Sequence, residues 1–269
     1  MSKKPIIVFE GIEGSGKSHH ISIVSKYLKN NKIDFLKIRE PGGNSNSEKI
    51  RKIILSNKSN FNKNTDLLLY MAARSENISQ IQKYFHKNIF EPLGMRDTYF
   101  NVPASKAKRL PMVYTEDSTN KIIEWSPSFR NIDPNYPLLG TSFFSGGAGL
   151  SSTAFDYAIF LQMILNGGKY NGKQIISPRT AELMLSPQLD FKFEGLNDFG
   201  LGFALTSEKA ANLNARNKGS FSWGGYYGTT YWADPKEKLI CLIMTQHTPN
   251  SHTGFSAKIE NIIYGSLIK

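Results

Sequence analysis

Residues 11–18 read Gly11-Ile12-Glu13-Gly14-Ser15-Gly16-Lys17-Ser18, and this stretch decides the fold of the first part of the chain. It follows an apolar run at residues 6–9 and precedes a helical pattern from about residue 15 to residue 31. Glycines let a backbone curl so that several N–H groups point at one anion, and the dipole of a following helix favours negative charge there. The spacing G-x-x-x-x-G-K-[ST] therefore predicts a phosphate-binding loop between a strand and a helix.

The predicted loop would hold ATP with Mg²⁺. Lys17 can reach the terminal phosphates, which makes it a candidate catalytic residue, and the hydroxyl of Ser18 can bind the metal ion. A chance glycine turn before a helix is the alternative, and the eight-residue pattern in this context argues against it. The predicted phosphate ligands are Gly11, Glu13, Gly14, Ser15, Gly16, Lys17 and Ser18.

A second strand is expected at residues 35–38, directly before Arg39-Glu40-Pro41-Gly42-Gly43. Strand, helix and strand within this length form a βαβ unit, which implies a parallel sheet with ligands at the carboxyl ends of its strands. Arg39 and Glu40 would then lie at the same edge of the sheet as the phosphate loop. Two helical segments follow, one with apolar residues at positions 50, 53 and 54 and one from about residue 65.

Three stretches of residues 1–82 together resemble the thymidylate kinase family: residues 9–18, residues 39–43, and Leu67-Leu68-Leu69-Tyr70-Met71-Ala72-Ala73-Arg74. A phosphate loop alone is widespread, but the Arg-Glu-Pro-Gly-Gly turn is characteristic of these kinases. The resemblance implies phosphoryl transfer from ATP to dTMP. It covers residues 1–82, which we call the first segment.

The resemblance also implies a dTMP site. Glu10 and Arg39 would lie near the acceptor phosphate, with Arg39 as a second candidate catalytic residue, and Tyr70 would stack on the thymine ring. Arg74 would pair with the dTMP phosphate, for which the fork of an arginine is well suited. Without the resemblance, Tyr70 could be a core residue and Arg74 a solvated helix residue.

The kinase resemblance stops near residue 82. The family next shows a buried strand that ends in Asp-Arg-Tyr or Asp-Arg-Phe, and no Asp-Arg pair occurs in this sequence. The arginine-rich lid is absent as well. Phosphoryl transfer depends on positioning and charge stabilisation, so we expect nucleotide binding with impaired catalysis.

Residues 83–269, the second segment, have a different pattern. A glycine loop at residues 145–153 leads into a helix that we expect to be capped by a serine, and the chain ends in strands and a helix. The predicted fold is therefore α/β, with an incomplete P-loop βαβ unit joined to an incomplete α+β segment that has an antiparallel sheet. The expected elements of the second segment are helices at residues 155–165, 178–184 and 254–267, and strands at 219–225, 229–234 and 238–245.

Several stretches of the second segment resemble the serine β-lactamase-like family, which includes class C β-lactamases and related esterases. They are Ile-Phe-Glu-Pro-Leu-Gly-Met (89–95), Ser-Gly-Gly-Ala-Gly-Leu-Ser-Ser (145–152), Asn-Gly-Gly-Lys-Tyr-Asn-Gly-Lys (166–173) and Ser-Trp-Gly-Gly (222–225) with Trp-Ala-Asp-Pro (232–235). The resemblance implies that Trp223, Gly224 and Gly225 line a hydrolase active site, where one backbone N–H would help to form an oxyanion hole. An ordinary strand aromatic followed by a glycine bend is the alternative.

The nucleophile of that family is not expected in this chain. Its Ser-x-x-Lys and Tyr-x-Asn elements belong upstream of the matching part, where this chain has kinase-like sequence. Two stretches match these patterns in residue type but not in their expected position in the chain: Ser105-Lys106-Ala107-Lys108 and Tyr99-Phe100-Asn101. Three histidines, His86, His247 and His252, show no metal-ligand spacing and no paired carboxylate, and we assign them no role.

Composition supports a soluble nucleotide-binding protein. The net charge is +11, but no run of five or six basic residues occurs, and the basic excess near the phosphate loop suits an anionic nucleotide better than a nucleic acid. Cys241, the one cysteine, lies in an apolar run and is predicted to be buried. We expect neither a signal peptide nor a membrane partner, and we expect a cytoplasmic location.

Three hypotheses follow for a chain that joins two incomplete enzymes within a helix near residues 78–88. The first, which we favour, is a nucleotide-binding chimera with little or no kinase turnover. The second is a working dTMP kinase whose missing groups come from the second segment. The third is a serine hydrolase, or an inactive penicillin-recognising fold without its nucleophile.

Overall fold

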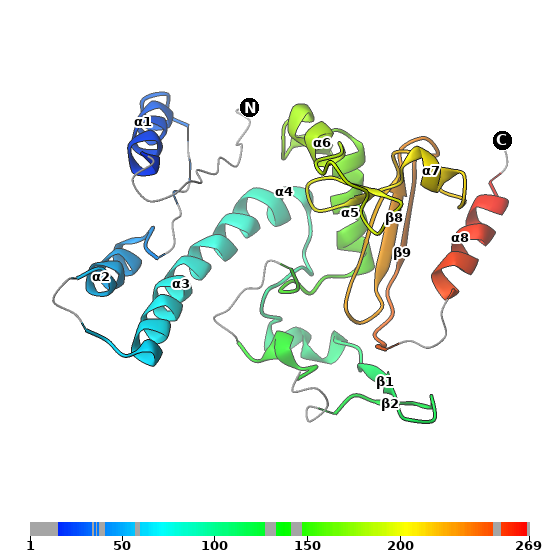
Figure 1. The fold of residues 1–269 in the computed structure, drawn as a ribbon, viewed down its shortest axis with the longest axis horizontal. Coiled ribbons are helices and arrows are strands. Elements are labelled where there is room, and N and C mark those ends of the chain that lie inside the picture. The colour runs from blue at the N-terminus through cyan, green and yellow to red at the C-terminus, as the bar shows by residue number, and fades with distance from the viewer. Residues whose placement is uncertain are drawn as a thin grey trace. The chain divides into compact units, whose positions relative to one another are not determined.

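The computed structural model describes residues 16–33, 35, 37, 41–56, 60–126, 133–140, 147–249 and 254–267, without the side chains of residues 74, 75 and 77–81. These residues form two compact units, of which the first ends at Pro92 and the second begins at Leu93 (Figure 1). Within the described part of the chain, no helix has the length and apolar character needed to cross a membrane.

The first unit contains three main helices: α1 (Lys17–Asn30), α2 (Ser45–Ile54) and α3 (Lys63–Phe85). Asparagine side chains cap two of them, as expected for a residue whose oxygen can accept from the free N–H groups of the first turn: Asn44 accepts from Ser47 N, and Asn62 accepts from Thr65 N. α2 packs against α3 (Figure 1). All three helices lie where the sequence patterns predict helices.

The parallel βαβ unit of the predicted fold is not shown by the structure. Its first strand, at residues 6–9, lies outside the described residues. Of the second expected strand, at 35–38, only residues 35 and 37 are described, and neither belongs to a strand. The helix between the two expected strands, α1, is present.

The helix that begins at Lys63 continues through a π-helical turn, η1 (His86–Phe90), and ends as α4 (Glu91–Leu93). Pro92 explains the wider turn. Proline has no N–H, and in a regular α-helix its ring would clash with the carbonyl four residues earlier. In the π turn, Glu91 N donates to His86 O, five residues earlier. The predicted boundary between residues 82 and 83 therefore lies inside an unbroken helix.

The second unit is built on a five-stranded antiparallel sheet with strand order β5-β6-β7-β8-β9. The strands predicted at the end of the sequence are β7, β8 and β9, and each of the three predicted helices is found. The elements of the sheet are β5 (Asp198–Phe199), β6 (Ala204–Leu205), β7 (Phe221–Gly224), β8 (Thr230–Asp234) and β9 (Leu239–Ile243). The other elements are η2 (Ala104–Arg109), β1 (Tyr114–Glu116), β2 (Ile122–Glu124), η3 (Tyr136–Leu138), α5 (Ala154–Leu165), β3 (Lys169–Tyr170), β4 (Lys173–Gln174), α6 (Pro178–Met184), α7 (Glu208–Ala211) and α8 (Phe255–Gly265).

Helices lie on both faces of this sheet (Figure 1), and successive side chains of β8 point to opposite faces and contact them. The ring of Tyr231 lies 5.0 Å from that of Tyr157 of α5. On the opposite face, Asp234 accepts a hydrogen bond from Tyr264 of α8. The core includes Trp232 and Phe221, which are completely buried.

Two details differ from the expectations. Cys241 is half-buried rather than buried, because β9 is the outermost strand of the sheet in the described part of the chain. The cap of α5 is Thr153 and not a serine: its Oγ1 accepts from Asp156 N at 3.2 Å. Serine and threonine hydroxyls can both make this bond. The sequence therefore predicted a hydroxyl cap but not which residue provides it.

Candidate functional site

The end of the predicted phosphate loop has the conformation of a helix start. Gly16 precedes α1 with φ +78°, in the left-handed region that favours glycine, and Lys17 is the first helical residue. The first turn of α1 contains no acidic side chain, so nothing in that turn offsets the positive end of the helix dipole. This arrangement suits an anion at the helix N-terminus. The other predicted residues of the loop, Gly11, Glu13, Gly14 and Ser15, lie outside the described residues, as does Glu10.

Ser18 fits the role of a metal ligand. Its side chain is exposed in the first turn of α1. Mg²⁺ binds few protein oxygens and completes its shell with nucleotide phosphates and water, so an exposed hydroxyl at this position could supply one ligand. Among the residues that the structure describes, no cluster of three or more His, Cys, Asp or Glu side chains could hold a metal ion.

Two residues of α2 hold the turn that follows Arg39 and Glu40. Gly43 N donates to Oε1 of Glu48 at 2.8 Å, and Nη1 of Arg51 donates to Pro41 O at 2.8 Å. Arg39 itself lies outside the described residues. We did not predict Glu48 or Arg51 from the sequence, because their partners are backbone groups, which exist at every position and leave no local signature.

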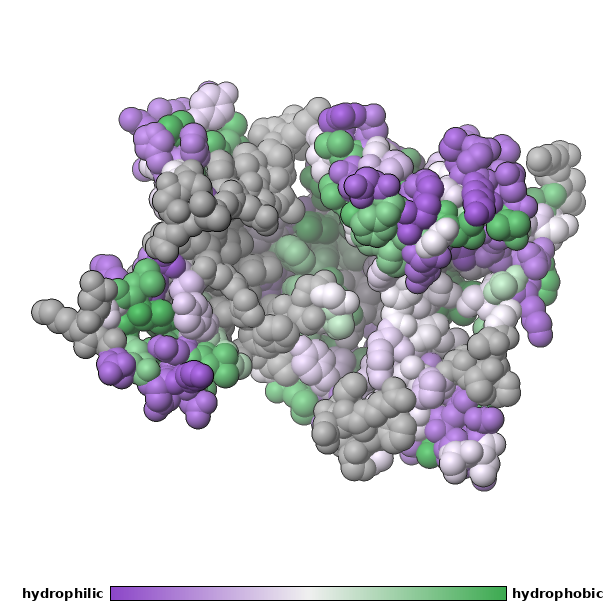
Figure 2. Space-filling view, viewed as in Figure 1, coloured by the Kyte–Doolittle hydropathy of each residue, from purple (hydrophilic) through white to green (hydrophobic). Residues whose placement is uncertain are grey.

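Tyr70 is not a core residue, because it is 46% exposed in α3. Its ring is therefore accessible, as the role implied by the resemblance requires. Three apolar residues near it on the same helix are also exposed: Leu67, Leu68 and Met71. Figure 2 shows hydrophobic residues at the surface around α2 and the first turns of α3. The side chain of Arg74 is not described.

Trp223, Gly224 and Gly225 lie at the end of β7 and are all exposed, Trp223 by 41%. The indole of Trp223 contacts the rings of Phe193 and Phe199, with centroids 5.6 and 5.4 Å away. These contacts hold the indole beside the two glycines.

The N–H of Gly225 donates to Thr229 O at 2.7 Å and closes the β7–β8 turn. In an antiparallel pair, successive residues direct their N–H groups to alternate sides of the strand. The N–H of Gly224 therefore faces away from β8. Gly224 is thus the better oxyanion donor of the two. A Cβ on Gly225 would lie 2.1 Å from Oγ1 of Thr229, so a side chain at this position would require the Thr229 hydroxyl to move.

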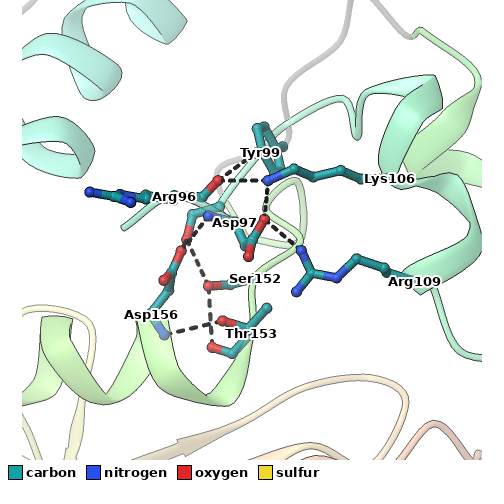
Figure 3. A network of polar contacts seen from close by, with 9 residues as sticks. Arg96, Asp97, Tyr99, Lys106, Arg109, Ser152, Thr153 and Asp156 are labelled. Atoms are coloured by element: carbon teal, nitrogen blue, oxygen red, sulfur yellow. Dashed lines mark hydrogen bonds and ion pairs between the residues drawn. The ribbon is translucent and has the colours of Figure 1, made fainter. Parts of the chain in front are cut away.

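The Ser105–Lys108 stretch forms the 3₁₀ turn η2, in which Ser105 is exposed. The neighbouring Lys106 and also Arg109 form ion pairs with Asp97, the latter at 2.8 Å (Figure 3). This cluster holds η2 against the loop after α4. The stretch therefore has a structural explanation, and nothing in it resembles a nucleophile on the buried face of a helix.

The polar cluster continues from Asp97 to the start of α5 (Figure 3). Oδ2 of Asp156 accepts from Asp97 N at 2.7 Å and from Thr98 Oγ1 at 2.9 Å. The hydroxyls of Thr98 and Ser152 lie 2.8 Å apart. Thus the carboxylate of Asp156 joins the Arg96–Tyr99 loop to the first turn of α5, and the Thr98–Ser152 pair joins that loop to the end of the glycine loop.

Lowering the pH should weaken the ion pairs of Asp97 in this cluster. Hydrogen bonds from Lys106 and then Arg109 hold the pKa of Asp97 below its usual value. Because the folded pKa is lowered, the stabilisation is present above the unfolded value of about 3.9 and is lost as the pH falls through the folded value. We expect Asp97→Asn to remove this part of the acid sensitivity, measured as the denaturation midpoint between pH 7 and pH 2. An equal acid shift in the variant and the wild type would contradict the role of Asp97.

His247 corrects one sequence-based expectation, because it does have a paired carboxylate. Its Nε2 lies 3.4 Å from Oε1 of Glu116, with side chains 14% and 4% exposed. The bridge between Tyr114 and His247 brings the two together from distant parts of the sequence. His86 is exposed in η1, and His252 lies outside the described residues.

Comparison with known sequences finds two families along the chain, and their matches overlap at residues 59–89. A thymidylate kinase family model matches residues 9–89, and a beta-lactamase family model matches residues 59–262. The thymidylate kinase of Thermosipho africanus is 46% identical over 90 residues, which are 34% of this chain and 45% of that protein. Protein Rv1367c of Mycobacterium tuberculosis is 29% identical over 207 residues, which are 72% of this chain and 50% of that protein.

Solved structures resemble the chain in fold. EstCE1, described as a hydrolase with promiscuous acyltransferase activity, has a TM-score of 0.59 at 21% identity over 73% of this chain and 54% of its own. Simvastatin synthase (LovD) from Aspergillus terreus has a TM-score of 0.57 at 22% identity over 68% of this chain and 50% of its own. The chain spans about half the length of the curated relatives that it matches.

These matches agree with the sheet and helices of the second unit and with the phosphate-loop motif of the first segment. The chain has two parts of different ancestry: it belongs to the beta-lactamase family through residues 59–262, and its N-terminal segment is similar to thymidylate kinases.

Proposed function

We propose that the first segment binds ATP with Mg²⁺ at residues 11–18 and binds dTMP near Arg39, Tyr70 and Arg74, with little or no phosphoryl transfer. The observation that carries this proposal is the start of α1. A G-x-x-x-x-G-K-S sequence runs into a 14-residue helix, with Gly16 in the left-handed conformation and Lys17 at the first helical position. Ser18 would bind the metal ion, which helps to neutralise the phosphates when bound.

We expect weak phosphoryl transfer because charged groups that the kinase family uses are missing from this chain. The transferred phosphoryl group needs cations and an oriented acceptor around it. The chain has no Asp-Arg pair to supply the carboxylate and arginine of the kinase family. We place this activity in the cytoplasm, where ATP and dTMP are available, and we propose no nucleic acid or membrane partner.

Calorimetric titration of the whole chain tests binding, with ATP and MgCl₂ in one series and dTMP in another. We expect saturable heats for both nucleotides and no dTDP formation above background in a coupled assay. The thymidylate kinase of Thermosipho africanus is the positive control. Absence of ATP binding would contradict the proposal, and turnover near that of the control would support the working-kinase alternative.

The exposed end of β7 supports a second candidate, a hydrolase-like unit that recognises acyl or penicillin-type ligands but lacks its nucleophile. We expect neither a fluorophosphonate nor a fluorescent penicillin to label any serine, because no Ser-x-x-Lys lies within an α-helix of the described part of the chain. Gel fluorescence and mass spectrometry measure the labelling, with a class C β-lactamase as positive control for the penicillin. Labelling that Ser105→Ala removes would show that the letter match at residue 105 is a real nucleophile.

A further inference from the structure

α2 contacts two segments that adjoin residues assigned to dTMP by the kinase resemblance: the turn that follows Arg39, and α3 beside Arg74. It holds the turn at Pro41–Gly43 through Glu48 and Arg51, each bond being 2.8 Å long. These two side chains are three residues apart and project from one face of the helix. They fix backbone atoms at both ends of the turn.

The same helix is also attached to α3. The hydroxyl of Ser47 donates to Ala73 O at 2.7 Å, and both residues are completely buried. A second, exposed bond joins Asn46 to Glu76 at 3.0 Å. Ala73 lies between Tyr70 and Arg74 in the sequence, so the attachment point is within one helical turn of both.

The backbone of the turn needs this support. Gly42 and Gly43 have φ values of 118° and 110°, a region that only glycine adopts easily. Glycine is the most flexible residue in the unfolded chain, so holding two in sequence requires external contacts. Glu48 and Arg51 provide such contacts from a helix that is itself fixed to α3.

We propose that α2 is a spacer that sets the distance between the Pro41–Gly43 turn and the Ala73 region of α3, and that Glu48, Arg51 and Ser47 are positioning residues for dTMP. This inference rests on the proposed function. It adds that dTMP affinity depends on side chains that need not touch the nucleotide. ATP affinity, which depends on residues 11–18, should be independent of them.

The test is the affinity of the whole chain for dTMP and for ATP with MgCl₂. Arg51→Met keeps most of the apolar stem but removes the donor to Pro41 O. The matched control is Lys52→Met, at the neighbouring exposed position of the same helix. We expect Arg51→Met to weaken dTMP binding by about tenfold, as for loss of a hydrogen bond from a charged group, while ATP affinity and helix content stay unchanged.

Two substitutions of Glu48 distinguish a positioning role from a general loss of structure. Glu48→Gln keeps an oxygen that can accept from Gly43 N, whereas Glu48→Leu does not, so we expect dTMP affinity to survive in the first and fall in the second. This pair also serves if Arg51→Met fails to fold. Wild-type dTMP affinity in both Arg51→Met and Glu48→Leu would overturn the inference, as would parallel losses of ATP and dTMP affinity. A wild-type chain that binds ATP but not dTMP would overturn it too, whereas one that binds neither contradicts the proposed function itself.

Discussion

Replacing Lys17 with alanine should weaken ATP binding by about a hundredfold or more. In a phosphate loop the lysine ammonium makes charge-assisted hydrogen bonds to phosphate oxygens, each contributing about 1.5–3 kcal/mol. Loss of two such bonds therefore corresponds to at least two powers of ten in the dissociation constant. The structure places Lys17 at the first position of α1, next to the left-handed Gly16. Calorimetry with ATP and MgCl₂ measures the change.

Lys26→Ala is the matched control, because Lys26 is an exposed lysine of the same helix but lies more than two turns from its N-terminus. Its removal should leave ATP affinity within about twofold of the wild type, since surface charge acts weakly at that distance. Equal losses in the two variants would mean that ATP binds only through the general positive charge of the chain. In that case the phosphate-loop interpretation is wrong.

Replacing Asp234 with alanine should destabilise the second unit by at least about 3 kcal/mol, because it removes several hydrogen bonds to a buried carboxylate, each contributing about 1.5–3 kcal/mol. Asp234 is completely buried at the end of β8. Its Oδ2 accepts from Asn217 Nδ2 and Tyr264 OH, at 2.8 and 2.7 Å. Its Oδ1 accepts from the backbone N–H groups of Lys236 and Glu237. Without the carboxylate, the β8–β9 turn, the Asn217 loop and α8 lose a common partner.

Burial by itself would raise the pKa of Asp234, but the hydrogen bonds from Tyr264 and Asn217 outweigh it and lower the pKa. The carboxylate is therefore charged at neutral pH. Tyr264→Phe is the graded control, because it removes one hydrogen bond and should cost about 1–2 kcal/mol. Urea denaturation followed by tryptophan fluorescence measures both variants. A loss under about 1 kcal/mol for Asp234→Ala would show that water replaces the carboxylate.

Local sequence determined the longer helices and the last three strands. Ser177 and Pro178 mark the start of α6 by capping chemistry, and the structure has this helix at Pro178–Met184, as predicted. Strands β7, β8 and β9 lie within the predicted ranges, because their apolar runs and glycine turns are local signals. The motifs of both families are likewise contiguous in sequence, which is why the two-part composition could be predicted.

Tertiary structure alone decided the contacts that tie these elements together. Glu116 meets His247, and Asp156 holds the loop of Asp97, although neither pair is close in sequence. Glu48 and Arg51 bind backbone atoms of a glycine turn. A sequence pattern records periodicity and caps over a few residues, whereas such contacts depend on where remote segments meet and on backbone groups that every residue possesses.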